Sequence, residues 1–106
     1  MEKIGETREN GPAKLDPPAF NPPPEMRSAY LARRRGELDA LRLCARRGDW
    51  RPVSVTANHV RGTGAMYGFP NIGEAAEKLA KAIQNEESNC LDLAEGYFRA
   101  VNESYT

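Results

Sequence analysis

Prolines cluster at the start of this chain, and they decide which part of it can form regular secondary structure. Six of the eight prolines fall within the first 24 of the 106 residues, and three of them are consecutive at 22–24. A proline ring fixes φ and removes a backbone donor, so such a segment favours extended conformations and cannot hold a helix. We interpret residues 1–24 as a proline-rich flexible tail, with a ligand for the aromatic groove of a partner as the alternative. One folded domain is then expected over residues 25–106.

The remaining sequence predicts helices. Apolar residues recur at helical spacing in four segments separated by turn signals, at about 25–47, 50–66, 71–85 and 88–104. Gly48 suits the end of the first helix, and Asp49 suits the N-cap of the second. The stretch 53–56 also fits a strand by propensity, so local signals support the second helix less well than the other three. Four amphipathic helices joined by short loops favour an all-α fold, an antiparallel four-helix bundle.

The composition excludes several classes of chemistry. The chain has one histidine, His59, and two cysteines, Cys44 and Cys90, too few for a disulfide scaffold or a cysteine-ligated metal site. No Ser/His/Asp set or phosphate-binding glycine loop can be assembled, so we expect no enzyme, no catalytic residue, no metal and no cofactor. No secretory signal or membrane-spanning run is visible, so the expectation is a cytoplasmic protein with free thiols and no membrane contact.

The predicted helix 50–66 has an unusual polar side. At about 100° per residue, its apolar residues share one stripe. This stripe comprises Val53, Ala57, Val60, Gly64 and Tyr67. The opposite side is centred on Gly62 and carries Asn58, His59, Arg61, Ala65 and Met66. A glycine costs about 1 kcal/mol relative to alanine inside a helix. Close packing against a neighbouring helix would explain Gly64, whereas bare Gly62 suggests a surface that another macromolecule approaches.

These residues resemble a known family. The segment 57–68 (ANHVRGTGAMYG), followed by Phe69, Pro70 and Ile72, is similar to the histidine phosphotransfer (HPt) domain of bacterial phosphorelays. The resemblance runs from about Tyr30 to the C-terminus. It implies a four-helix bundle of HPt type, with no catalytic activity of its own. It also implies a receiver domain of a response regulator or a histidine kinase as partner, and one exposed histidine that carries a phosphoryl group between them.

The chain departs from the family at the residue that matters most. Arg61 and Gly62 match the family's Lys/Arg-Gly pair and Gly68 its later glycine, and this register puts Asn58 where the phosphorylated histidine belongs. A carboxamide nitrogen has no free lone pair and is no phosphoryl acceptor, unlike an imidazole. We favour a phosphorylation-deficient adaptor that docks through Arg61, Gly62, Ala65 and Met66. The alternative is an active carrier that uses His59, although a shift of one residue moves the side chain by several ångströms, which in-line transfer tolerates poorly.

Charge is divided unevenly along the chain. Residues 27–61 contain nine basic and three acidic side chains, a net charge of +6, whereas residues 62–106 contain three basic and seven acidic ones, a net charge of −4. The basic half could steer the protein toward an acidic receiver pocket, or it could simply be a solvated arginine face. Two hypotheses from a different class of function stay open, a helical nucleic-acid-binding module and a dimerisation module. We expect instead a monomer that binds no nucleic acid. The nucleic-acid reading would use six arginines: Arg33, Arg34, Arg35, Arg46, Arg47 and Arg51.

Overall fold

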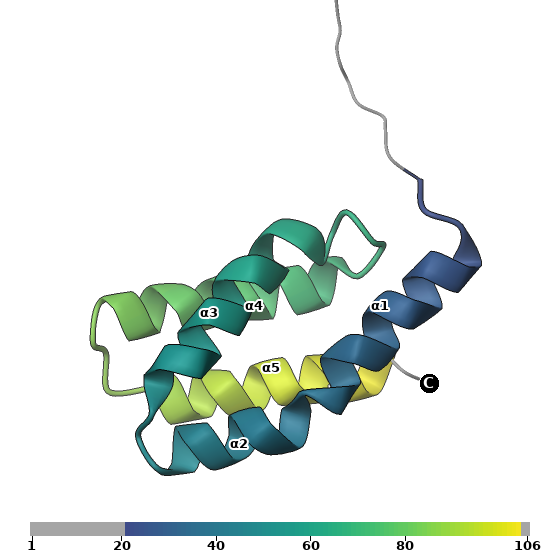
Figure 1. Ribbon diagram of the computed structural model, residues 1–106. Helices are drawn as coiled ribbons and strands as arrows, with labels where there is room; N and C mark the ends of the chain where they lie inside the picture. The colour runs from purple at the N-terminus through teal and green to yellow at the C-terminus, as the bar shows by residue number, and fades with distance from the viewer. Residues whose placement is uncertain (1–20, 105–106) are drawn as a thin grey trace, which may run out of the picture.

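The computed structural model describes residues 21–104, and these residues are all-helical with no strand among them. The helices are α1 (Pro24–Gly36), α2 (Leu38–Arg46), α3 (Trp50–Thr63), α4 (Pro70–Gln84) and α5 (Cys90–Ser104). A single residue, Glu37, separates α1 from α2, so these two helices form one bent arm of a four-arm bundle. Successive arms run in opposite directions (Figure 1). The tail predicted for residues 1–24 lies almost wholly outside the described residues.

Two of the predicted helices have different limits in the structure. The continuous helix expected over 25–47 is wrong, because it breaks at Glu37. There the backbone N–H bonds to the carbonyl of Arg34, three residues back, after the poor helix former Gly36. The helix expected over 50–66 ends at Thr63, and the chain then turns through Gly68 at a φ of 93°. The stretch 53–56 is helical, as the bundle requires, and not a strand.

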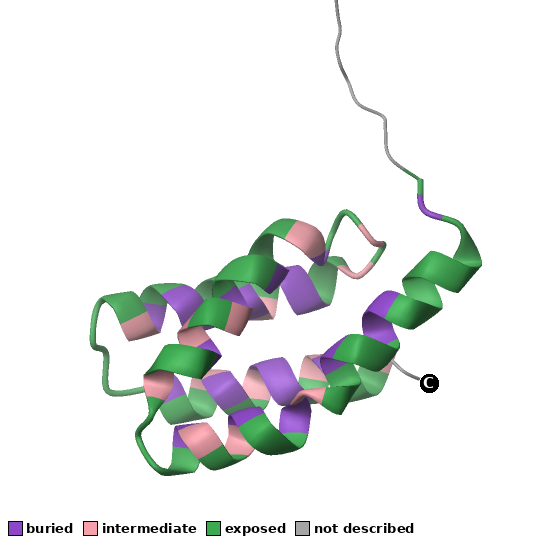
Figure 2. Cartoon of the chain, viewed as in Figure 1, coloured by how far each residue is buried: buried purple, intermediate pink, exposed green. Residues whose placement is uncertain are grey.

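The core lies between the arms. Buried residues lie on the inner side of the helices, and exposed residues cover the outside (Figure 2). The predicted apolar stripe of α3 is confirmed at Val53, Ala57 and Val60, each at most 1% exposed. Leu91, near the start of α5, is an exception among the large apolar side chains and is 52% exposed. Tyr97 and Phe98 of α5 are the largest fully buried side chains.

The arms differ in how closely they pack. α3 packs most extensively on α4, and α4 on α5, while α2 contacts both α3 and α5. α1 leans on α5 and α2 but its backbone does not approach that of α3. Gly48 joins α2 to α3 at a φ of 75°, and Asp49 occupies the predicted N-cap position without a side-chain cap hydrogen bond. Cys44 and Cys90 are both free, and no helix within residues 21–104 has the length and hydropathy to span a membrane.

Candidate functional site

The predicted docking residues lie together on the outer surface of α3 and the turn that follows it. Asn58, Arg61, Gly62, Ala65 and Met66 are all exposed, Met66 by 49%, and we call these five residues the docking face. A Cβ built on Gly62 would meet no atom within 4 Å. Gly62 therefore makes no close internal contact that would explain a glycine in the last turn of a helix.

Gly64 and Gly68 have internal roles, which separates them from Gly62. A Cβ on Gly64 would lie 2.6 Å from the backbone nitrogen of Gly73 on α4, so α3 and α4 touch there backbone to backbone. This confirms the packing role predicted for Gly64. Gly68 has a positive φ, and a Cβ there would also press on the Arg27 guanidinium, whose Nε donates to the Tyr67 carbonyl at 3.2 Å. Only glycine fits either position without a shift of its neighbours.

The Asn58 side chain is bound to its own helix. Its Nδ2 donates to the Ser54 carbonyl oxygen at 3.0 Å and lies 3.4 Å from the Ser54 hydroxyl oxygen. The carboxamide is thus held down on α3 by the residue one turn earlier. Its nitrogen is a donor only, with no lone pair available for attack on phosphorus. Asn58 can contribute a hydrogen bond to a docked partner but no covalent chemistry.

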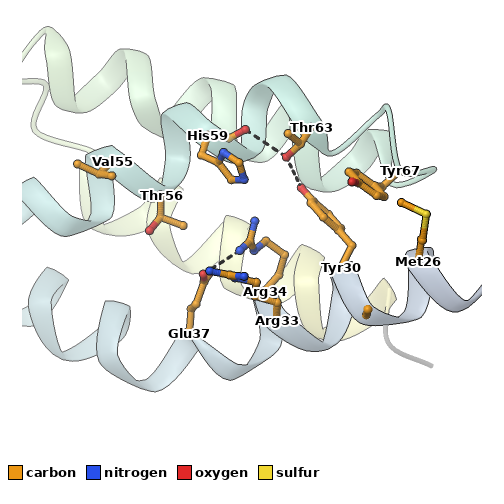
Figure 3. A pocket seen from close by; sticks show the side chains of 11 residues that line it. Met26, Tyr30, Arg33, Arg34, Glu37, Val55, Thr56, His59, Thr63 and Tyr67 are labelled. Atoms are coloured by element: carbon orange, nitrogen blue, oxygen red, sulfur yellow. Dashed lines mark hydrogen bonds and ion pairs between the residues drawn. The ribbon is translucent and has the colours of Figure 1, made fainter. Parts of the chain in front are cut away.

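His59 lies on a different side of α3 from Asn58 and lines a pocket. This pocket, which we call the α1–α3 pocket, has a volume of about 710 Å³ and separates the two helices. Figure 3 shows the His59 ring pointing from α3 toward α1, where Arg33 and Arg34 face it across the pocket. The imidazole remains accessible to solvent, but from the pocket between two helices and not from the centre of the docking face.

One wall of the α1–α3 pocket contains a buried arginine. Arg34 is only 3% exposed, and its Nη2 donates to Glu37 Oε2 at 2.8 Å. Within residues 21–104, Arg34 Nε, Glu37 Oε1 and the Tyr97 hydroxyl are buried without a hydrogen-bond partner. Burial raises the pKa of the Tyr97 phenol far above its ordinary value, while the positive charge of Arg34 lowers it in part. Polar groups in such surroundings are costly unless something pairs with them.

Aromatic side chains hold the other end of this pocket together. The Tyr30 ring stacks on Tyr67 at 4.5 Å between centroids and lies 6.1 Å from Phe69, with both pairs nearly parallel. The Tyr30 hydroxyl and the Thr63 hydroxyl are 2.7 Å apart, a direct hydrogen bond between α1 and α3. The Arg34 guanidinium lies 5.1 Å from the Tyr30 ring centroid and so joins this end to the charged one. Sequence reasoning did not find this arrangement, because it assembles residues more than 30 positions apart.

The arginines predicted to form one basic surface differ in how far they are exposed. Arg33, Arg35, Arg46, Arg47 and Arg51 are exposed, but Arg34 is buried in the pocket wall. Arg42 lies over the Phe98 ring at 5.0 Å, with Glu95 at 3.9 Å from its Nε. The run Arg33–Arg35 is therefore not a uniform solvated face. Its middle residue is part of the interior.

Comparison with known proteins identifies no relative whose site could be set beside this one. No family model, curated protein or solved structure matches this chain. In the part of the chain that the structure describes, no group of three or more His, Cys, Asp or Glu residues could hold a metal ion.

Proposed function

We propose that this chain is an HPt-like signalling adaptor that docks a receiver domain or a histidine kinase without accepting a phosphoryl group. The docking face of α3 would form the contact, with Asn58 in the place where an active carrier has histidine. By occupying a receiver or kinase, the protein would compete with an active carrier.

The observation that carries this proposal is the open space around Gly62. A solvated helix face has no need of glycine, which inside a helix costs up to about 1 kcal/mol relative to alanine. With no neighbour within 4 Å of the position of a Cβ, packing inside the molecule does not account for it. A partner whose surface must approach the α3 backbone would account for it, and the small side chain of neighbouring Ala65 fits the same explanation.

The orientations of residues 58 and 59 favour the adaptor over an active carrier. Consecutive side chains on a helix diverge by about 100°. A partner centred on Gly62 would meet Asn58, while His59 faces α1 across the pocket (Figure 3). In-line phosphoryl transfer loses efficiency steeply when the acceptor is misplaced by even about 1 Å. The exposed Arg61 and the +6 charge of residues 27–61 support an acidic partner surface.

Binding and phosphotransfer assays test the two halves of this proposal. A panel of receiver domains and kinases would be titrated against the protein, Gly62→Gln and the matched control Gly96→Gln. Gly96 lies within α5 and also has open space around it, but the backbone of α5 does not approach that of α3. We expect Gly62→Gln to weaken binding at least tenfold and Gly96→Gln to leave it unchanged. Equal binding by both variants would exclude the docking face.

Phosphotransfer distinguishes the adaptor from the carrier. With a phosphorylated receiver as donor, we expect no label on the protein and a new, acid-labile label on Asn58→His. Label on the unchanged protein that disappears in His59→Ala would establish His59 as the acceptor and overturn the adaptor assignment.

A further inference from the structure

We propose that the α1–α3 pocket binds a small amphipathic carboxylate, a singly charged head on an aromatic or aliphatic body. The pocket combines a buried, incompletely paired arginine with apolar side chains at its mouth. This inference does not depend on HPt-type docking, because the residues that carry it lie outside the docking face.

The charged end of the pocket selects the head group. Arg34 projects from α1 into the space below α3 (Figure 3), and its Nε has no partner among the described residues. Arg33 lies on the same wall, and no ion pair of Arg33 is found within residues 21–104. A guanidinium presents its donors in a planar fork that matches the two oxygens of a carboxylate.

The charge balance of the pocket favours one negative charge over two. Arg33 and Arg34 supply two positive charges, and Glu37 removes one, with His59 counted as neutral. A doubly charged phosphate ester would bring two negative charges close to Glu37 Oε1, which is buried there without a hydrogen-bond donor of its own. The carboxylate of Glu37 would therefore repel it more strongly than it would repel a singly charged head. A carboxylate brings a single charge and leaves the existing Arg34–Glu37 pair in place.

The apolar part of the pocket selects a body for that head. The Tyr30 ring and Ala29 lie on the α1 side, and Val55, 64% exposed, lies on the α3 side. A volume of about 710 Å³ is in the range of about 300–1,000 Å³ that is usual for small-molecule sites, and it is too large for a bare inorganic ion. Exposed apolar side chains beside a charged anchor match a ligand that has both characters.

The hydroxyl bridge of Tyr30 and Thr63 limits the size of the occupant. It crosses between α1 and α3 at 2.7 Å, and both residues line the pocket. An extended peptide running along the whole pocket would have to break this bridge and part the Tyr30–Tyr67 stack. A small molecule on the Arg34 side of the bridge leaves both contacts intact.

Nuclear magnetic resonance titration of the full chain tests this site with defined probes. These are 4-phenylbutyrate, its neutral counterpart 4-phenylbutan-1-ol, and phenyl phosphate. We expect saturable shifts of the Ala29, Thr56 and Thr63 amides with 4-phenylbutyrate, and at least tenfold weaker binding of the alcohol and of phenyl phosphate. Equal binding of acid and alcohol would overturn the proposal, as would shifts confined to other parts of the chain. Tighter binding of phenyl phosphate would overturn the choice of a carboxylate.

Variants of the two pocket arginines complete the test. Exposed Arg33→Met should weaken 4-phenylbutyrate at least fivefold, and Arg34→Met should abolish its binding. Arg51→Met is the matched control, since Arg51 is exposed on α3 and does not line the pocket. If Arg34→Met fails to fold, Arg33→Met and the neutral probe still decide the matter. Unchanged affinity in Arg33→Met, or an equal loss in Arg51→Met, would refute the assigned site.

Discussion

Gly62 and Gly64 are two residues apart, yet replacing each by alanine should change the stability of the fold in opposite directions. In Gly62→Ala the new methyl group meets open space, and the substitution removes backbone freedom from the unfolded chain. A full helix-interior gain would be about 1 kcal/mol. Because Gly62 lies one residue from the end of α3 at Thr63, we expect about 0.5 kcal/mol.

In Gly64→Ala the new methyl group has no room. It would lie 2.6 Å from the nitrogen and 2.8 Å from the Cα of Gly73, and 3.1 Å from the Phe69 carbonyl oxygen. All three atoms belong to the backbone, so relief requires α3 and α4 to move apart at the most extensive contact of the bundle. Overpacking of this kind costs about 1–3 kcal/mol. After the same gain of about 0.5 kcal/mol in the unfolded state, the net effect should be a loss of about 0.5–2.5 kcal/mol.

Thermal unfolding followed by circular dichroism at 222 nm measures both effects. For a domain of this size, 1 kcal/mol corresponds to a shift in Tm of about 4–8 °C. We therefore expect Gly62→Ala to raise Tm by about 2–4 °C and Gly64→Ala to lower it by about 2–20 °C. Gly96→Ala, also without neighbours but in the interior of α5, is the control and should raise Tm by about 4–8 °C. A loss of stability in Gly62→Ala, or none in Gly64→Ala, would show that the two glycines do not have the distinct roles assigned to them.

Two further predictions concern the tyrosines beside the pocket. Tyr30→Phe removes the 2.7 Å hydrogen bond to Thr63 and should lower the free energy of unfolding, measured in urea, by about 1 kcal/mol. Combining it with Thr63→Val should add little further loss. Fully additive losses would argue against the bond. Tyr97 has a raised pKa in the folded state, so above about pH 10 the unfolded chain loses a proton that the folded protein keeps, and stability falls with pH by up to about 1.4 kcal/mol per unit. Tyr97→Phe should lack this part of the decline between pH 9 and 11 and should be at least as stable at pH 7, because no buried hydroxyl is left unpaired; an unchanged decline would contradict the cause assigned to the shift.

Local signals predicted most of the helices but not the bend in the first arm. The positive φ at Gly48 and Gly68 and the buried stripe of α3 follow from residue type and helical period alone. The break at Glu37 could not be found in this way, because Leu31, Leu38 and Leu41 keep one apolar period across it. The side chains of these residues are buried on both sides of the break. Gly36 is the one local signal for a break at this point, and a glycine inside a helical pattern does not by itself end a helix.

The docking face could be predicted from the sequence, whereas the pocket could not. Every residue of the docking face lies on α3 or the turn after it, so helical geometry sufficed to predict that these side chains share a surface. The pocket joins Arg34 of α1 and His59 of α3, and the charge of Arg34 also acts on the buried Tyr97 of α5. No sequence spacing brings these residues together. An arginine inside a run of three is expected to be exposed to solvent. The burial of Arg34 depends on how α1 packs against α5.

The bend at Glu37 has a consequence for how the fold opens. The backbone of α1 approaches only α2 and α5, and far less extensively than α4 packs on α3 and α5. An element with so few buried contacts unfolds locally at a lower free energy than the whole domain. The amide hydrogens of α1 should therefore exchange with solvent in a step that leaves α3, α4 and α5 protected. A molecule held against Arg34 would slow that step, so the rate at which α1 opens would report on whether the space behind it is occupied.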